Sequence, residues 1–178
     1  MFILILKGFY RNWKIRGEKR MSKKEMLVYR FERVVNAPID VVFEYVDNDE
    51  KVKLWNTMIV ENIYESEEDA RMGKPGTKFK SVQKFDNKTF TVDCVMTEYD
   101  PPYKIVLHSE SKEGISISRY FLSREYNSTR LVVEASLIPR NFLYKFTAKI
   151  FGKAAGFVFN EQFENLVRLI EEELDEAY

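Results

Sequence analysis

A succession of alternating segments joined by short turns constrains this chain of 178 residues more than any other feature. Between residues 57 and 138, runs rich in β-branched and aromatic residues are separated by turn signals such as Gly73-Lys74-Pro75-Gly76, Asp86-Asn87-Lys88 and Asn127-Ser128. Segments with such short connections pair in an antiparallel manner, because a parallel pair needs a crossover of a dozen or more residues. Together with the run at 27–35, they predict one sheet of seven antiparallel strands.

Alternation within these segments predicts which side chains face inward. It is clearest at residues 90–97, where Phe90, Val92, Cys94 and Met96 alternate with mostly polar residues. In the preceding segment, Phe79 alternates with a face made mostly of lysine, which must lie in water. We therefore expect these five side chains on the inner face of the sheet.

Two short helices are predicted after the first strand. The segment Asn36-Ala37-Pro38-Ile39-Asp40 combines a capping residue, a proline suited to the first helical turn and an acid near the positive helix end. Apolar residues then recur at helical spacing up to Val46, and residues 50–55 have the pattern of a second short helix.

A long helix is predicted at the end of the chain. Pro139 ends the last strand, and residues 141–176 read as helix throughout. The second half has one apolar side, as an amphipathic helix requires, whereas the first half is more apolar than one buried face needs. We expect that first half to contribute Phe142, Phe146, Ile150 and Phe157 to the interior.

The composition excludes several classes of protein. Apolar residues make up 45% of the chain, and 28 basic residues balance 28 acidic ones, which argues against nucleic-acid binding by the body of the protein. Cys94 and His108 are the only residues of their kinds, so a disulfide framework, a structural zinc site and an iron–sulfur cluster are not expected. No phosphate-binding glycine motif and no metal-ligand spacing is present, so we expect no cofactor and no metal.

The neutral balance hides a basic N-terminal leader at residues 1–25. Residues 1–24 hold eight basic residues and one acid, a net charge of +7. Two interpretations are open: weak contact with an anionic membrane surface, or a peripheral leader without fixed structure, upstream of a chain that starts at Met21. The apolar run Phe2–Leu6 is far shorter than a bilayer span and lacks the features of a secretory signal, so a cytoplasmic location is expected.

The chain resembles the START-like (SRPBCC) superfamily, which includes lipid-transfer domains, plant pathogenesis-related allergens and polyketide cyclases and dehydrases. The resemblance covers about residues 27–175 and omits the leader. It rests on four short segments in the order typical of that superfamily, namely Asn36–Asp47 with the later Trp55-Asn56, Pro75–Phe79, Tyr99–Ile105 and Ser128–Leu131. These segments point to the superfamily but to no activity within it.

The resemblance implies an α+β helix-grip fold over residues 26–178: a curved seven-stranded antiparallel sheet, in the order β-α-α-β6-α, wrapped on a long C-terminal helix. Such a sheet leaves a mainly apolar cavity against the helix. Each expected lining residue has an alternative role in filling the core. The expected lining is Trp55, Phe79, Phe90, Val92, Cys94, Met96, Ile105, Leu107, Phe142, Phe146, Ile150 and Phe157.

Three further residues carry candidate chemistry. If Ile105 and Leu107 point inward, His108 points outward, which argues against acid–base catalysis by its imidazole. Cys94 has the character of a small buried apolar residue rather than a nucleophile. Arg119 has three interpretations: a ligand anchor for a carboxylate or phosphate, a structural pair with Glu134, or a solvated cation on a strand whose inner face carries Tyr120 and Leu122 instead.

Three functional hypotheses follow. The first is a protein that binds a small hydrophobic or amphipathic molecule in the cavity. The second is a cyclase- or dehydrase-like enzyme that acts in the same cavity, for which no catalytic residue is assigned. The third is a lipid carrier at a membrane surface, which uses the leader and the aromatic first half of the last helix. The sequence leaves the identity of the ligand and the oligomeric state open.

Overall fold

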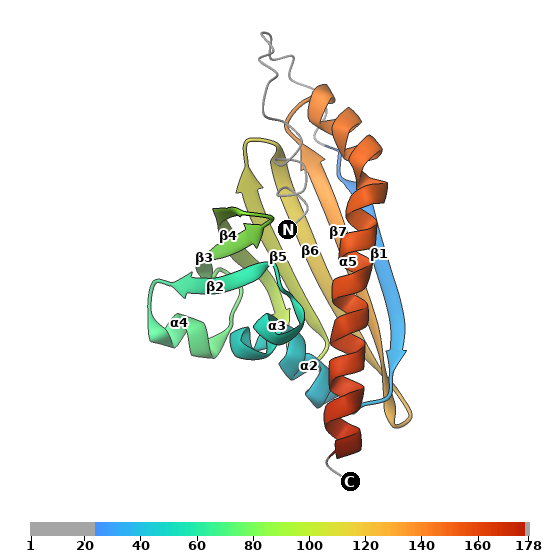
Figure 1. Cartoon of the computed structure of the whole chain (residues 1–178). Helices are drawn as coiled ribbons and strands as arrows, with labels where there is room; N and C mark the ends of the chain where they lie inside the picture. The colour runs from blue at the N-terminus through green and yellow to red at the C-terminus, as the bar shows by residue number, and fades with distance from the viewer. Residues whose placement is uncertain (1–23, 177–178) are drawn as a thin grey trace.

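The computed structural model describes residues 24–176, without the side chains at 72, 151, 153 and 154. All but the last two residues of the predicted leader lie outside the described residues. These described residues build eleven elements, most of which form one sheet with a long helix laid against it (Figure 1). In order they are β1 (Met26–Val35), α2 (Ile39–Asp47), α3 (Asp49–Trp55), β2 (Ile59–Tyr64), α4 (Glu67–Met72), β3 (Lys78–Phe85), β4 (Lys88–Asp100), β5 (Lys104–Ser111), β6 (Gly114–Glu125), β7 (Ser128–Pro139) and α5 (Phe142–Glu176).

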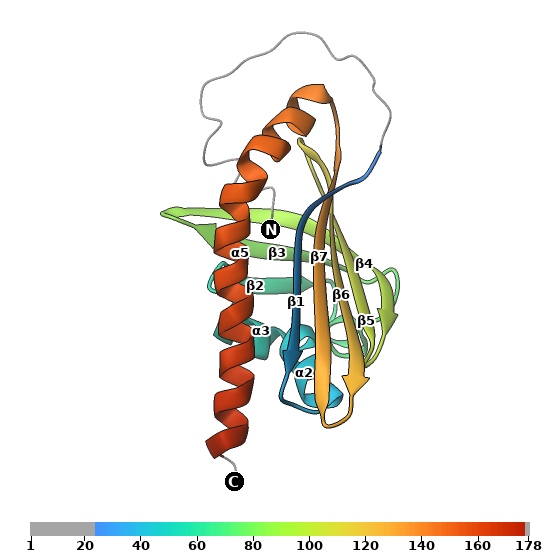
Figure 2. The same cartoon turned by 90° about the vertical axis from the view of Figure 1, so that its right-hand side faces the viewer.

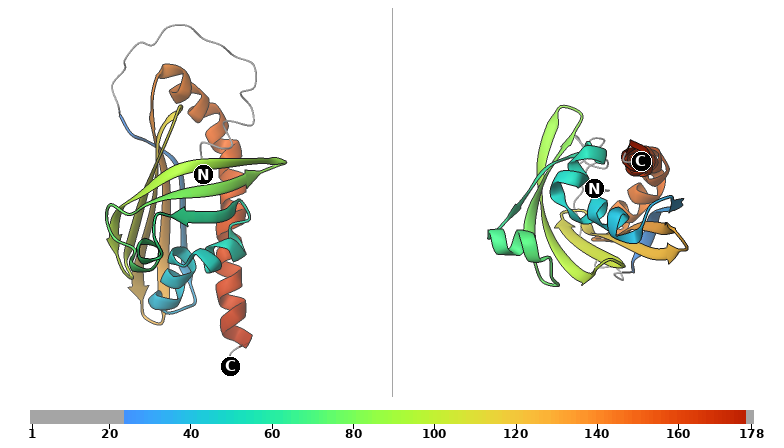
Figure 3. Two further views of the ribbon diagram at one scale, coloured as in Figure 1. Left: turned by 90° about the vertical axis from the view of Figure 1, so that its left-hand side faces the viewer. Right: turned by 90° about the horizontal axis from the view of Figure 1, so that it is seen from below.

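The seven strands form one sheet in the order β1-β7-β6-β5-β4-β3-β2, and every pairing is antiparallel. The prediction of an α+β fold with a curved antiparallel sheet and a C-terminal helix is confirmed. Short hairpins join β3 to β7 in succession, and the two strands that precede this series in the chain, β1 and β2, form the two edges of the sheet. In Figure 2 the helix α5 runs along the sheet beside β1 and β7, and Figure 3 shows the curled end of the sheet, β2 to β4, on the side away from α5.

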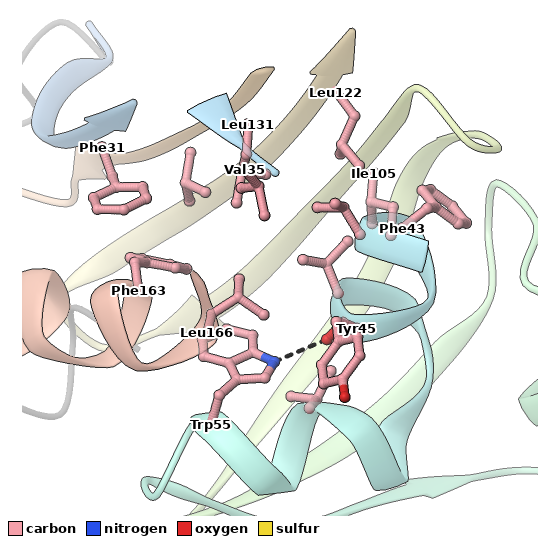
Figure 4. Packing of buried hydrophobic residues seen from close by; sticks show 14 of the residues in the cluster. Phe31, Val35, Phe43, Tyr45, Trp55, Ile105, Leu122, Leu131, Phe163 and Leu166 are labelled. Carbon is pink, nitrogen blue, oxygen red and sulfur yellow. Dashed lines mark hydrogen bonds between the residues drawn. The ribbon is translucent and has the colours of Figure 1, made fainter. Parts of the chain in front are cut away.

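Aromatic rings hold α5 to the sheet and to α3. Phe163 of α5 is 1% exposed, and its ring centroid lies 5.3 Å from that of Phe31, 5.4 Å from that of Trp55 and 6.3 Å from that of Tyr120. Trp55 Nε1 donates a hydrogen bond of 2.8 Å to the backbone oxygen of Tyr45, so the indole is buried without an unpaired donor (Figure 4). This cluster packs α5 against the sheet and α3.

The helix α4 is absent from the sequence-based prediction, which placed an acidic stretch and a turn there. Ser66 Oγ accepts a hydrogen bond of 3.1 Å from the backbone nitrogen of Asp69, as an N-cap does. The segment Ser66-Glu67-Glu68-Asp69 therefore carried a capping signal, followed by a single turn too short to show an apolar period. The helix lies beyond the edge strand β2 (Figure 1).

Candidate functional site

A small hollow lies between the inner face of the sheet and α3. Its volume is about 90 Å³. Trp55 closes one side, and Met96, Ile105, Leu107 and Tyr120 give it an apolar floor. The remaining lining is largely polar. It is supplied by the ends of α2 and α3 and by strands β2 to β6, in the residues Val46, Asp47, Asp49, Val52, Asn56, Ile59, Asn62, Tyr64, Phe79, Ser81, Gln83, Cys94, Ser109 and Ser118.

The polar part of this lining forms a patch on the inner face of the sheet. Ser81, Gln83 and Ser109 are all buried, and Gln83 Nε2 donates a hydrogen bond of 3.1 Å to Ser81 Oγ. Gln83 Oε1 and Asn62 Oδ1 are buried and have no hydrogen-bond partner among the described residues. Buried amide oxygens are nearly always paired in proteins, so two orphaned acceptors beside one hollow mark it as a place for a hydrogen-bond donor.

Two carboxylates stand where the hollow meets the surface. A second hollow of about 490 Å³ lies on the outer side of Asp47 and Asp49, and both line the inner hollow as well, together with Tyr64 and Met96. Glu44, Glu50 and Asp69 add further acidic groups to the outer hollow, and Arg71, which pairs with Glu67 at 2.6 Å, is the one basic side chain among its described lining residues. We call this outer hollow the acidic mouth. The shared lining makes the two hollows neighbours.

Hydrogen bonds hold both carboxylates in place. Asp49 Oδ1 accepts from Asn62 Nδ2 at 2.6 Å and from the Tyr64 hydroxyl at 3.5 Å. Asp47 Oδ2 accepts from the Tyr99 hydroxyl at 2.9 Å. The two carboxylates come from neighbouring helix ends, since Asp47 ends α2 and Asp49 begins α3.

Burial raises the pKa of Asp47 and of Asp49 above the ordinary aspartate value. The tyrosine hydroxyls lower the pKa of each acid, but the cost of removing the charges from water is larger. Burial and the neighbouring carboxylates also raise the pKa of Tyr64 and of Tyr99 well above the usual range. The mouth is therefore a partly desolvated acidic environment that favours a donor or a cation over an anion.

The sequence matches the family described as Activator of Hsp90 ATPase homolog 1-like protein over residues 36–171. This chain belongs to that family. The family lies in the START-like superfamily, as the four sequence segments indicated. No curated protein matches the chain.

Solved structures share the fold of this family member. The protein of unknown function SA2116 from Staphylococcus aureus is 14% identical with a TM-score of 0.66, and the match covers 85% of this chain and 97% of that one. NE0264 from Nitrosomonas europaea is 13% identical with a TM-score of 0.63, covering 88% and 99%. Ara h 8.0201 is 15% identical with a TM-score of 0.60, covering 84% and 99%. At these identities the likeness extends to the fold alone.

In this Activator of Hsp90 ATPase homolog 1-like chain, half of the predicted lining residues border the inner hollow. They are Trp55, Phe79, Cys94, Met96, Ile105 and Leu107. Phe90 and Val92 lie further along β4 on the same face of the sheet and do not border it. Sequence reasoning missed Asp47, Asp49 and Asn62, although the acidic run Asp47-Asn48-Asp49 between two predicted helices was visible as a signal.

The predicted contribution of α5 to the lining is corrected. Phe142, Phe146, Ile150 and Phe157 are 61%, 53%, 52% and 80% exposed, on the side of the helix that faces away from the sheet. The buried side of the same stretch consists of small residues, because β1 approaches closely: a Cβ added at Gly152 would lie 3.3 Å from Val28 Cγ1. The larger apolar side chains are thereby left on the outside.

The prediction that Arg119 lines the cavity is also corrected, because this side chain lies on the outer face of the sheet. Tyr120 and Leu122 point into the core on this strand, as the third interpretation of Arg119 had it. Its guanidinium pairs with Glu25, at 2.6 Å from Nη1 to Oε1 and 3.1 Å from Nη2 to Oε2, rather than with Glu134. The pair lowers the pKa of Glu25. Arg119 therefore cannot anchor a ligand in the hollow.

Other candidate groups do not form a second chemical centre. His108 points away from α5 as expected, and burial lowers the pKa of its imidazole. Burial raises the pKa of the Cys94 thiol, so the thiolate needed for nucleophilic attack is disfavoured. Within residues 24–176 no group of three metal-ligating side chains is found, and no helix in that range is long and apolar enough to cross a membrane.

A further groove of about 510 Å³ lies on the outer face of the sheet. Ile63, Val95 and Ile115 form its apolar floor, with His108 beside them. Lys80 and Asp93 border it and pair with each other at 2.7 Å. This ion pair lies within the groove, in contrast to the orphaned acceptors of the inner hollow.

Proposed function

We propose that the protein binds a small amphipathic molecule that enters through the acidic mouth and reaches into the inner hollow. Its polar end carries hydrogen-bond donors, as a hydroxyl or an amine does, and faces Asp47, Asp49 and Asn62. Its apolar part lies against Trp55 and Met96. The molecule is short, since the inner hollow of about 90 Å³ is smaller than the several hundred Å³ of a typical ligand pocket.

The observation that carries this proposal is the pair of orphaned acceptors, Gln83 Oε1 and Asn62 Oδ1. A core that served only stability would place apolar side chains there, because a buried amide oxygen without a partner costs about 1–3 kcal/mol. Donors on a bound molecule would offset that cost. The raised pKa of Asp49 adds to the preference for a donor, since an anion would meet a partly buried carboxylate.

An NMR titration of the full chain with three probes of equal chain length tests the proposal: butylamine, butanol and butyrate. We expect saturable shifts for Asn62, Gln83 and Trp55, with affinity in the order amine, alcohol, acid. Asp49→Asn abolishes the preference for the amine. The matched control is Asp93→Asn on the exposed outer face, which keeps the preference. Absence of saturable shifts for all three probes, or equal selectivity in both variants, overturns the proposal.

The natural ligand can be sought by native mass spectrometry of protein purified from its own host. A retained molecule should carry a hydroxyl or amine group and few carbon atoms. A long-chain acid in that spectrum would contradict the proposal, because it would need a larger hollow and a cation to pair with.

A second candidate is acid–base catalysis on the bound molecule, and one contact favours it. The Asp49 carboxylate and the Tyr64 hydroxyl lie 3.5 Å apart beside the hollow, and the pKa of each is raised. A raised pKa makes a carboxylate a stronger base than an ordinary aspartate, which favours proton transfer to and from a bound molecule. Recovery of the natural ligand chemically unchanged after prolonged incubation with the protein would exclude this candidate and leave binding.

A further inference from the structure

The first half of α5 presents an aromatic stripe to the surface. Phe142, Phe146, Ile150 and Phe157 recur at helical spacing along one side of the helix, and each is more than half exposed. We call these four residues the aromatic stripe. Single exposed apolar residues are common, but four large ones in one line form a contiguous apolar surface of the kind that marks an interaction site.

Charge accompanies the stripe. Residues 142–160 contain three lysines, Lys145, Lys149 and Lys153, and no acid, whereas residues 161–176 contain seven acids and one arginine. Neither Lys145 nor Lys149 forms a salt bridge within the described part of the chain. The helix is thus divided into a basic aromatic half and an acidic half.

The point at which the described chain begins adds more positive charge nearby. The beginning of β1 lies against the first half of α5, since a Cβ added at Gly152 would lie 3.3 Å from Val28 Cγ1 and one at Gly156 would lie 3.7 Å from Tyr29. Figure 2 shows the beginnings of β1 and α5 at the same end of the molecule. The residues before 25, with their net charge of +7, therefore join the domain at the same end as the aromatic stripe, by way of Glu25 on the outer face of the sheet.

We propose that this end of the molecule docks on an anionic lipid membrane. The aromatic stripe enters the interface between headgroups and acyl chains, while Lys145 and Lys149 contact the lipid phosphates. An exposed aromatic face flanked by lysines is the composition that places a helix in the membrane interface. A protein partner is less well matched, because it would need an acidic surface large enough for both the helix and the leader. This proposal concerns a surface outside the hollow and does not depend on the proposed ligand.

The test is co-sedimentation of the full chain with lipid vesicles. We expect the chain to bind vesicles of equal parts phosphatidylcholine and phosphatidylglycerol, and to stay in solution with phosphatidylcholine alone. Binding should weaken as ionic strength rises, because salt screens the lysines from the phosphates. The double variant Phe146→Ser/Phe157→Ser should lower the partition coefficient about tenfold or more, since it removes two side chains from the interface.

The matched control is Tyr126→Ser. Tyr126 is fully exposed, and the β6–β7 turn that carries it lies at the other end of the molecule (Figure 2), so this variant should bind vesicles as the wild type does. Unaltered thermal unfolding of both variants verifies the fold. Equal binding by the double variant and the wild type would overturn the proposal, since vesicle binding would then not depend on the aromatic stripe. Failure of the wild type to bind anionic vesicles would also overturn it, as would a dimer in sedimentation equilibrium that the double variant converts to monomer.

Discussion

Asn62 Nδ2 donates a hydrogen bond of 2.6 Å to Asp49 Oδ1 and so joins β2 to the first turn of α3 across the acidic mouth. This contact fixes the orientation of the amide, because an ionised carboxylate accepts but cannot donate. Asn62 Oδ1 is therefore the atom left in the buried space without a partner in the described chain. One pair of residues thus sets both the structure of the mouth and its preference for donors.

The first prediction concerns Asp49→Asn and pH. Burial raises the folded-state pKa of Asp49 above its unfolded value, so the folded state binds the proton more tightly than the unfolded state does. Ionised Asp49 thus destabilises the fold, and this effect develops as pH rises from the unfolded pKa through the folded pKa. The variant cannot ionise, so its melting temperature relative to wild type should be higher at pH 7 than at pH 3.

Thermal unfolding followed by circular dichroism at the two pH values checks this. Asp93→Asn, on the exposed outer face, is the control and should show no gain in melting temperature over wild type at pH 7, because it only removes an exposed ion pair with Lys80. A wild type that gains stability over Asp49→Asn as pH rises would show that the hydrogen bonds from Asn62 and Tyr64 outweigh burial, contrary to the expectation.

The second prediction compares two phenylalanines of α5. Phe163 is 1% exposed and lies among four aromatic rings, so Phe163→Ala should lower the free energy of unfolding by about 3–5 kcal/mol. Phe157→Ala makes the same chemical change at a side chain that is 80% exposed, and it should shift that free energy by no more than about 0.5 kcal/mol. Urea denaturation measures both. Similar losses for the two variants would mean that the first half of α5 is packed against something outside residues 24–176.

This pair of residues also illustrates what the sequence could predict. Periodicity of 2 and 3.6 predicted seven strands and the long helix, because short turns leave an antiparallel sheet few alternatives. It placed Phe163 correctly on the single apolar side of the second half of the helix, but it could not tell that Phe157 faces solvent, since the first half is apolar on more than one side. That choice depends on how closely β1 approaches the glycines of α5, a tertiary distance that periodicity does not record.

The candidate site was predictable only in its apolar half. Met96, Ile105 and Leu107 follow from strand parity, and the structure places them at the hollow. Asp49 and Asn62 resemble ordinary solvated residues in the sequence, and only the folded arrangement brings them together at the mouth. Arg119 was misjudged between two faces of one strand, because apolar residues occupy both sides of β6 and give no clear alternation.

The third prediction concerns Gly114, in the hairpin between β5 and β6. Its φ is +144°, and a Cβ there would lie 2.1 Å from the backbone oxygen of Ile138, which cannot move without breaking the pairing of β6 with β7. Gly114→Ala should therefore destabilise the protein by at least about 2 kcal/mol. Gly76 provides the comparison, because its φ is +96° but no atom lies within 4 Å of an added Cβ. Gly76→Ala therefore introduces backbone strain without a collision. Gly76→Ala should cost less, as chemical denaturation of both variants will show; equal losses would argue against a collision.

The last prediction concerns the ion pair of Arg119 with Glu25. Both side chains are partly exposed, at 22% and 38%, so a double-mutant cycle of Arg119→Met and Glu25→Gln should give a coupling of about 0.2–1 kcal/mol. Arg119 lowers the pKa of Glu25, so this stabilisation is present above the unfolded pKa of the glutamate and is lost as pH falls through its folded pKa. The coupling measured at pH 7 should therefore vanish in acid.

The preference among butylamine, butanol and butyrate should be the same in Arg119→Met as in wild type, because the guanidinium lies on the outer face. A changed preference would place Arg119 in contact with the ligand and contradict the assignment of the site to the inner hollow.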